Sequence, residues 1–509
     1  MSRSAFIFIA IIIAISIPLT ILDYAHFPYS DGPEHGAAVR TLAKNWLHPG
    51  DPMLNTASGA SPRYVPSILI MALFVKISGL DVLVVLKLFE IVGFALFLIS
   101  VAFFSREYFN DAGQAAWSIA FLLFLWGLGW TGANAYMFSA ILYTAYYPSV
   151  VSFSLAFLAL YFQLRFLRGE RLGFLVGTLM VGALCFVNHP LTGGFFYICS
   201  AFLYLEKEGL NKKALSCYAL SIIVALCLTG LWPYYNFLAS FITVASGEMQ
   251  KTIDYISTHQ YLYSKVLLRS GTALTGIPVA FFYCVQRRYL LLWCGGLVFG
   301  LLYVYGFFRT ISLTERCIFF MLCLLQITVS RICREWSVTH VWTKHRIKKI
   351  IFCIIVLLLA GGIVTQSILT FKEFLYPSFA VSARSILPRY VNPNALHYEL
   401  KKHLKEGDVV LSDIYSAWSI PVYTGAKIVA LFHTPPHVPD NFKRVTDVEA
   451  FYTPSLSDPE RQKILQKYGV THIFLNFKIA GKELEPILLE KRYPVVVRTD
   501  SFCIFSTPK

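Results

Sequence analysis

The segment FIFIAIIIAISIPLTIL (residues 6–22) is followed, seven residues later, by Ser30-Asp31-Gly32-Pro33-Glu34-His35-Gly36. The first part is long enough to cross the hydrocarbon core of a membrane. The second part places two carboxylates and a histidine among turn residues. Only 29 of the 509 residues are acidic, and four of them lie in the loop 23–64: Asp23, Asp31, Glu34 and Asp51. Carboxylates beside a membrane are costly unless they are solvated or functional, so this loop is the first candidate for a site.

The composition of the whole chain is that of a polytopic membrane protein. Hydrophobic residues make up 56% of the sequence, charged residues 14%, and the mean hydropathy is +0.59. The net charge of +15 does not indicate nucleic acid, because basic residues concentrate in short connections between apolar stretches. Clusters occur at 165–171, 207–213, 287–288 and 331–349. This distribution is typical of the positive-inside rule, so we expect membrane lipids and no nucleic acid as partners.

Eleven apolar stretches are candidates for membrane helices, and one further run is shorter than any of them. The short run, 65–75, falls below the roughly 17–25 residues that a spanning helix needs. If it does not cross, all the basic connections face the cytoplasm, so we predict about eleven spans plus one short helix, within a range of 11–13. The longer stretches lie at 6–22, 82–104, 115–132, 148–166, 172–188, 191–205, 214–232, 272–285, 289–307, 313–330 and 348–369.

The last part of the chain, 370–509, changes character. Charges become frequent, and short β-type runs appear at 408–413, 427–432, 471–477, 495–499 and 502–506. Between them, Ser457-Asp-Pro-Glu460 has the pattern of a capping box, which predicts a helix ending near Gly469. We therefore predict two domains: a transmembrane domain, 1–369, with outer loops 23–64 and 233–271, and an extracytoplasmic α/β domain, 370–509.

The order of these parts resembles the GT-C superfamily of membrane glycosyltransferases, which includes protein mannosyltransferases, aminoarabinose transferases and oligosaccharyltransferase catalytic subunits. Shared features are a first span followed by a long acidic outer loop, about a dozen spans, and a C-terminal extracytoplasmic domain. Four short strings also look like bacterial members: SPRYVP (61–66), YYPS (146–149), NHPLTG (188–193) and TERC (314–317). The resemblance implies an enzyme that takes a hexosyl or pentosyl group from a polyprenyl-phosphate carrier and inverts its anomeric centre.

Asp31 and Glu34 are the predicted catalytic residues. An inverting transfer needs a carboxylate that deprotonates the acceptor, and Asp31 is the first choice for this base, with Glu34 assisting. The superfamily often has Asp-x-Asp, whereas this chain has Asp31-x-x-Glu34. The same two side chains would be the ligands if the enzyme uses a divalent cation. The alternative interpretation is that Asp31 only caps a helix over 34–47.

Five further residues are predicted to bind substrate. Arg316, Arg309 and Arg63 offer guanidinium groups suited to the carrier phosphate, although arginines near membrane ends also extend toward the interface for purely structural reasons. His189 lies in the turn between two spans, where a purely structural role is the main alternative. Tyr255 belongs to the tyrosine-rich outer loop 233–271, whose composition suits both carbohydrate and the membrane interface.

The sequence therefore predicts a glycosyltransferase in the bacterial cytoplasmic membrane, with its active site and C-terminal domain facing outward. The donor would be a polyprenyl-phosphate sugar, and the acceptor a glycan, lipid or protein. Two alternatives stay open. A transporter or flippase for lipid-linked saccharides would show internal repeats, and no clear repeat is present. A non-catalytic membrane scaffold would use the α/β domain to bind a partner.

Overall fold

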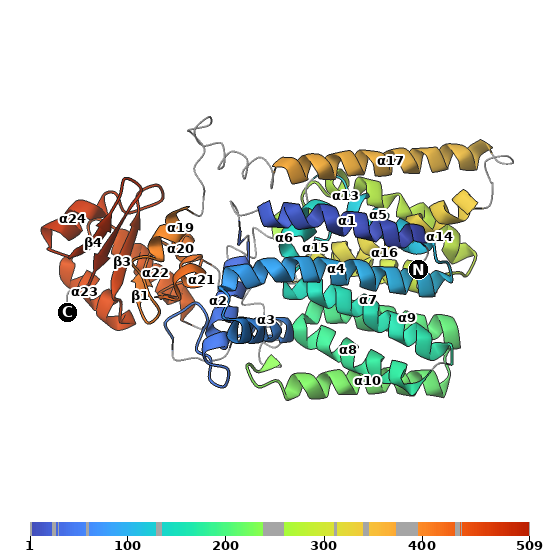
Figure 1. The fold of residues 1–509 in the computed structure, drawn as a ribbon, viewed down its shortest axis with the longest axis horizontal. Coiled ribbons are helices and arrows are strands. Elements are labelled where there is room, and N and C mark those ends of the chain that lie inside the picture. Colours follow the sequence, from blue (N-terminus) through green and yellow to red (C-terminus); the bar gives the residue numbers. More distant parts are fainter. Residues whose placement is uncertain are drawn as a thin grey trace.

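The computed structural model shows a bundle of long helices with a small sheet domain at one end (Figure 1). Its description covers residues 3–22, 27–28, 30–56, 61–128, 135–169, 171–237, 259–309, 313–338, 346–372, 395–432, 438 and 440–507.

Each of the eleven apolar stretches predicted as a span forms a helix or a bent pair of helices. Within the described ranges, six of these helices can cross a membrane by length and composition alone, and a pair bent by 42°, α13 and α14, makes a seventh. The elements are α1 (Arg3–Leu22), α4 (Val82–Phe109), α5 (Gln114–Phe124), α7 (Pro148–Leu167), α8 (Leu172–Asn188), α9 (Pro190–Glu208), α10 (Lys212–Gly230), α13 (Val266–Leu274), α14 (Gly276–Val285), α15 (Leu290–Arg309), α16 (Cys317–Val338) and α17 (Arg346–Thr370).

Two of these helices differ in extent from the prediction. The stretch 115–132 forms a helix only as far as Phe124, because the chain turns at Leu125 and its backbone then bonds to residues 268–269. The stretch 313–330 begins as the 3-10 turn η2 (Thr314–Arg316), and α16 then continues to Val338. In both cases local hydropathy fixed the position of the helix but not its ends.

The short run at 65–75 forms α3 (Pro66–Ser78), as predicted. Its 13 residues span about 20 Å at 1.5 Å per residue, which is less than the roughly 30 Å of a bilayer core. Pro66 opens the helix, and Gly79 closes it in the left-handed conformation at φ 68°. In Figure 1, α3 lies beside α2 (Gly32–Lys44) at the end of the bundle nearest the sheet domain.

The basic connections lie at the end of the bundle opposite α3, as expected if α3 does not cross the membrane. Arg168, in the turn after α7, pairs with Glu107 at the end of α4. Arg334 in α16 pairs with Asp111, which follows α4. Arg288, just before α15, pairs with Glu335 of α16. These contacts join four connections, so the loops with the highest positive charge share one face.

The C-terminal domain is a five-stranded mixed sheet with the strand order β2-β1-β3-β5-β4. β1 (Val409–Leu411) pairs in parallel with β2 (Lys427–Ile428) and β3 (His472–Asn476), and β5 (Phe502–Ser506) pairs antiparallel with β3 and β4 (Val495–Arg498). All five predicted strands are present. The helices are α19 (Ala395–Leu400), α20 (Ile414–Ala417), α21 (Ile420–Thr424), α22 (Asn441–Tyr452), α23 (Asp458–Tyr468) and α24 (Leu484–Glu490). The predicted capping box and the left-handed Gly469 bound α23.

The sheet domain packs directly on the acidic loop that follows α1. Leu54 forms a parallel bridge with Ile428 of the edge strand β2, through backbone bonds of 2.9 and 3.1 Å. Ala37 of α2, Met53 and Leu54 share one buried apolar cluster with the sheet domain. Residues near both ends of the sequence therefore form a single core.

Candidate active site

The local chain around Asp31 leaves its carboxylate available. Asp31 occupies the N-cap position of α2, but within the described part of the helix its side chain makes no capping hydrogen bond. Its backbone carbonyl instead accepts from the amides of Glu34 and His35, both at 3.1 Å. About a third of the Asp31 side chain is exposed. The capping interpretation therefore explains why Asp31 stands at the start of α2, but it gives no role to the carboxylate.

Glu34 and Arg63 form a buried pair behind Asp31. The Glu34 side chain is almost fully buried and pairs with the Arg63 guanidinium, whose Nη1 also lies 4.0 Å from Asp31 Oδ2. Burial alone would lower the pKa of Arg63, but the negative charges of Glu34 and Asp31 outweigh it and raise that pKa. Arg63 is therefore a permanent cation held between two carboxylates.

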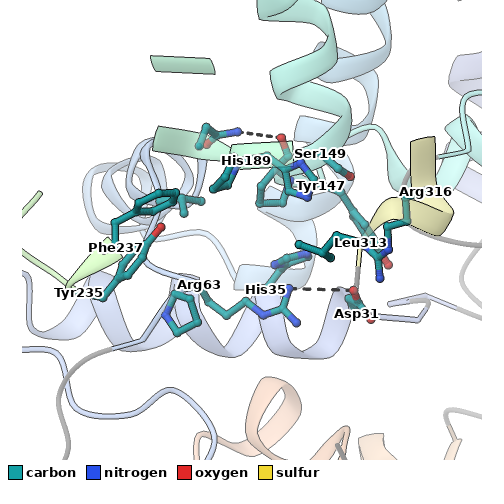
Figure 2. A pocket seen from close by; sticks show the side chains of 15 residues that line it. Asp31, His35, Arg63, Tyr147, Ser149, His189, Tyr235, Phe237, Leu313 and Arg316 are labelled. Atoms are coloured by element: carbon teal, nitrogen blue, oxygen red, sulfur yellow. Dashed lines mark hydrogen bonds and ion pairs between the residues drawn. The ribbon is translucent and has the colours of Figure 1, made fainter. Parts of the chain in front are cut away.

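A cavity of about 220 Å³ opens beside these groups. Asp31, Arg63, His189 and Arg316 approach it from four separate elements: the start of α2, the turn before α3, the α8–α9 turn, and η2 (Figure 2). Glu34 and Arg309 do not line it; Arg309 is exposed at the end of α15. Tyr255 lies outside the described residues. The full lining is Asp31, His35, Pro62, Arg63, Val65, Tyr147, Pro148, Ser149, Asn188, His189, Pro190, Tyr235, Phe237, Leu313 and Arg316.

Each of the four short strings singled out in the sequence contributes to this lining. SPRYVP supplies Arg63, YYPS supplies Tyr147, NHPLTG supplies His189, and TERC supplies Arg316. The strings are up to about 250 residues apart in the chain, and the bundle brings them to one place. The start of the outer loop 233–271 also reaches the cavity, through Tyr235 and Phe237.

Two histidines face the cavity in their neutral form. Burial lowers the pKa of His35 to about 4 and that of His189 to about 3, with the positive charge of Arg63 acting in the same direction on both. His189 Nδ1 accepts from the amide of Thr192 at 3.3 Å and so caps α9, which leaves the ring proton on Nε2. The structural role considered for His189 is thus present, and it coexists with a place in the cavity wall.

Asn188 is a residue that sequence reasoning missed. Its amide nitrogen donates to Pro148 O at 2.8 Å and to Ser152 Oγ at 2.9 Å, and its Oδ1 accepts from Ser67 N at 2.8 Å. These bonds tie α8 to α7 and to α3 directly at the cavity. The available signal was a polar amide at the very end of an apolar helix, where a buried polar side chain must find partners.

Gly32 allows two tyrosines to approach the start of α2. A Cβ atom at this position would lie 2.3 Å from Tyr146 Oη, so any larger residue would displace that ring. Tyr147 in turn packs edge-on against His35, with ring centroids 4.9 Å apart. The first turn of α2 is therefore fixed by aromatic side chains from the bundle.

The acidic pair does not fit a divalent cation in this arrangement. Arg63 lies against both carboxylates, so an added cation would face a resident positive charge. Among the described residues, no group of three His, Cys, Asp or Glu side chains is placed to hold a metal ion. No chemical step is therefore derived through a metal.

Comparison with solved structures shows the fold. An oligosaccharyltransferase of Archaeoglobus fulgidus in the apo form is 12% identical, with a TM-score of 0.58, over 96% of this chain and 73% of that one. ArnT of Cupriavidus metallidurans in the apo state is 13% identical, with a TM-score of 0.55, and the match covers both chains in full. The structure of the same ArnT bound to undecaprenyl phosphate is also 13% identical, with a TM-score of 0.56, and the match again covers both chains in full.

Both proteins are members of the GT-C superfamily, so the predicted fold class is confirmed: this chain has the GT-C fold. At sequence identities this low, the similarity establishes the fold and does not establish the function. No protein-family model and no curated protein matches the sequence.

Proposed function

We propose that this protein is an inverting glycosyltransferase that moves a sugar from a polyprenyl-phosphate carrier to an acceptor. The observation that carries the proposal is a cavity that joins one accessible carboxylate, Asp31, to two guanidinium groups, Arg63 and Arg316, at one end of an apolar bundle. A carrier of this class has an apolar chain suited to the bilayer and a phosphate at its surface. The fold shared with ArnT, whose solved structure holds undecaprenyl phosphate, supports this carrier class.

Asp31 is the base in this mechanism. Its carboxylate takes a proton from the acceptor as the acceptor atom attacks the anomeric carbon on the face opposite the phosphate. The bond between the anomeric carbon and the phosphate oxygen breaks, and its electron pair stays on that oxygen. The products are the glycosylated acceptor, with inverted configuration, and the polyprenyl phosphate. The phosphate leaves without being protonated, so one protein carboxylate is sufficient.

Arg316 and Arg63 stabilise the negative charge that develops on the departing phosphate. Glu34, predicted as a helper in catalysis, holds the Arg63 guanidinium at the cavity wall through a buried ion pair. The neutral histidines offer hydrogen bonds without adding charge, and the Nε2–H of His189 is a donor for a phosphate or sugar oxygen. The proposed base and the anion-binding groups thus line the same cavity, with Arg63 adjacent to Asp31.

The charge distribution supports an orientation for the chain. The connections with the highest positive charge share the end of the bundle opposite the cavity, and the positive-inside rule assigns that end to the cytoplasm. The cavity and the sheet domain then face outward, where a glycan, lipid or protein acceptor would be modified. A bacterial cytoplasmic membrane is the location that this orientation favours.

Reconstitution in lipid vesicles tests the proposal. Wild-type protein and Asp31→Asn are supplied with labelled polyprenyl-phosphate hexoses and pentoses and a panel of glycan, lipid and peptide acceptors. We expect a labelled product with wild type and its loss with the variant. Undiminished product in Asp31→Asn would remove Asp31 from its role. Movement of the carrier across the bilayer without product would support a flippase, and neither activity would support a scaffold.

A further inference from the structure

The sheet domain forms hydrogen bonds with the chain on both sides of Asp31. Trp418 Nε1 donates to the carbonyl of Ser30 at 2.9 Å, one residue before the proposed base. Tyr423 Oη donates to the carbonyl of Phe27, also at 2.9 Å. On the other side, Arg40 of α2 donates through Nη2 to the carbonyl of Val422 at 2.9 Å.

α21 is the element that meets α2, and the two pack closely. Gly36 lies against Val422, and a Cβ atom at Gly36 would come 2.4 Å from Val422 Cγ2. α21 itself is short and well fixed, with Pro421 in its first turn and a left-handed Gly425 at its end. Tyr423, in the same helix, is almost fully buried.

A second contact holds the loop farther along the chain. Residues 53–55 extend the sheet beyond β2, and Lys427 Nζ donates to the carbonyls of Asp51 at 2.5 Å and Pro52 at 3.1 Å. Tyr146 and Tyr147 of the helix bundle also pack against the first turn of α2. Asp31 is therefore held between two bodies, the helix bundle and the sheet domain.

We propose that the sheet domain positions the catalytic loop, and that Trp418 and Tyr423 are positioning residues that act through the backbone at Ser30 and Phe27. This inference rests on the proposed function, since it assigns these residues to the placement of Asp31. A base displaced by about 1 Å can lose up to about a hundredfold in rate. Binding of the carrier through Arg316 depends on a separate element, the turn η2.

The first test removes single donors. Tyr423→Phe and Trp418→Phe each delete one hydrogen bond to the loop and keep an aromatic ring. Tyr493→Phe is the matched control, because it deletes a similarly buried hydroxyl that accepts from Gln462 Nε2 within the sheet domain. We expect kcat to fall about tenfold in the two loop-facing variants, with the KM for the carrier changed less than twofold. Kinetics of Tyr423→Phe and Trp418→Phe that match the control would overturn the inference.

The second test uses compensation. Gly36→Ala adds the methyl group that meets Val422, and we expect kcat to fall about tenfold. Val422→Ala removes the opposing methyl groups, so the double variant should recover to within about threefold of wild type. A purely local effect at Gly36 would leave the double variant as impaired as the single one, which contradicts positioning through the sheet domain.

Hydrogen exchange separates this inference from the proposed function. Backbone amides in 30–44 should exchange faster in Tyr423→Phe and Trp418→Phe than in wild type or Tyr493→Phe. If the wild-type protein transfers no sugar, the proposed function fails while exchange still decides whether the sheet domain holds the loop. If transfer occurs and neither exchange nor kcat responds, only the positioning inference fails.

Discussion

The two ends of the helix bundle contain the same kinds of charged side chains in different arrangements. At the basic end, Arg334 binds both oxygens of Asp111, at 2.9 and 3.1 Å, and a third bond comes from the amide of Gly113. At the cavity end, Asp31 makes no capping bond within the described helix, and its nearest cation, on Arg63, is 4.0 Å away. The Asp111 carboxylate is fully hydrogen-bonded, whereas the Asp31 carboxylate can accept bonds from a further partner.

This difference shows why an ion pair alone does not mark a functional site. Arg331 and Arg334 of α16 pair with Asp111, which follows α4, and Arg331 also pairs with Glu335. These ion pairs have a structural role, because they hold helix ends together. Asp31 lines a cavity, with neutral histidines and a second arginine on the other walls. The two arrangements differ because the Asp31 carboxylate can still accept hydrogen bonds and lies beside a cavity, whereas the Asp111 carboxylate is occupied by its partners.

The largest effect expected is from the comparison of Asp31→Asn with Asp111→Asn. Loss of a general base lowers the transfer rate by about a thousandfold, so Asp31→Asn should be nearly inactive with an unchanged thermal unfolding midpoint. Asp111→Asn should keep its kcat and lose about 1–3 kcal/mol of stability. Rates and unfolding midpoints measured on both variants check this; an inactive Asp111→Asn of normal stability would break the distinction between the two ends.

Arg63→Gln should destabilise the protein more than Arg334→Gln does. Without Arg63 the buried Glu34 carboxylate lacks its counter-charge, which costs about 3–5 kcal/mol. Asp111 is more exposed, so loss of Arg334 should cost about 1 kcal/mol. Denaturant unfolding in detergent measures both. Adding Glu34→Gln to Arg63→Gln should restore most of the loss, and a double variant no more stable than the single one would refute the buried-pair explanation.

His35 should make stability depend on pH at the cavity end. Its pKa is about 4 in the folded protein against about 6.5 in an unfolded chain, so between these values the unfolded state binds the proton more readily. Stability is therefore complete above pH 6.5 and falls toward pH 4, by about 3 kcal/mol for this group. Unfolding midpoints of wild type and His35→Gln across this window provide the check, and we expect the shallower curve for His35→Gln. Parallel curves would contradict a buried neutral His35.

The smallest effect is expected from removal of metal ions. Because Arg63 already lies between the carboxylates of Asp31 and Glu34, we expect the transfer rate to stay within twofold after treatment with EDTA. Readdition of Mg²⁺ or Mn²⁺ to the chelated protein serves as the control. A rate that collapses with EDTA and returns with a metal ion would show that Arg63 leaves this position in the working enzyme.

The sequence predicted those features that depend on local composition. Apolar composition located the helices of the bundle, and the capping box of Ser457 and Glu460 located α23. Lys87 and Glu90, three residues apart within α4, form an ion pair at 3.1 Å, which their spacing on one helix face permits. Each of these properties is determined within one or a few turns of chain.

The parts of the site that the sequence did not reveal depend on distant contacts. Arg316 and Arg309 look equivalent in sequence, but only Arg316 lies in the turn η2 that faces the cavity. Glu34 was predicted as a helper beside Asp31, but its carboxylate is buried and pairs with Arg63, which comes from the turn before α3. The contact of Trp418 with Ser30 spans 388 residues, and no local pattern encodes it.

Because Ser30 and Trp418 are so far apart in the chain, the ribosome makes them at different times. The acidic loop is synthesised well before its partners in the sheet domain, because Trp418, which donates to Ser30, follows it by 388 residues. At ~5–20 residues per second, the loop waits roughly 20–80 s before the sheet domain exists to hold it. A nascent chain that already has the helices up to α17 therefore still lacks the sheet-domain contacts that hold the acidic loop.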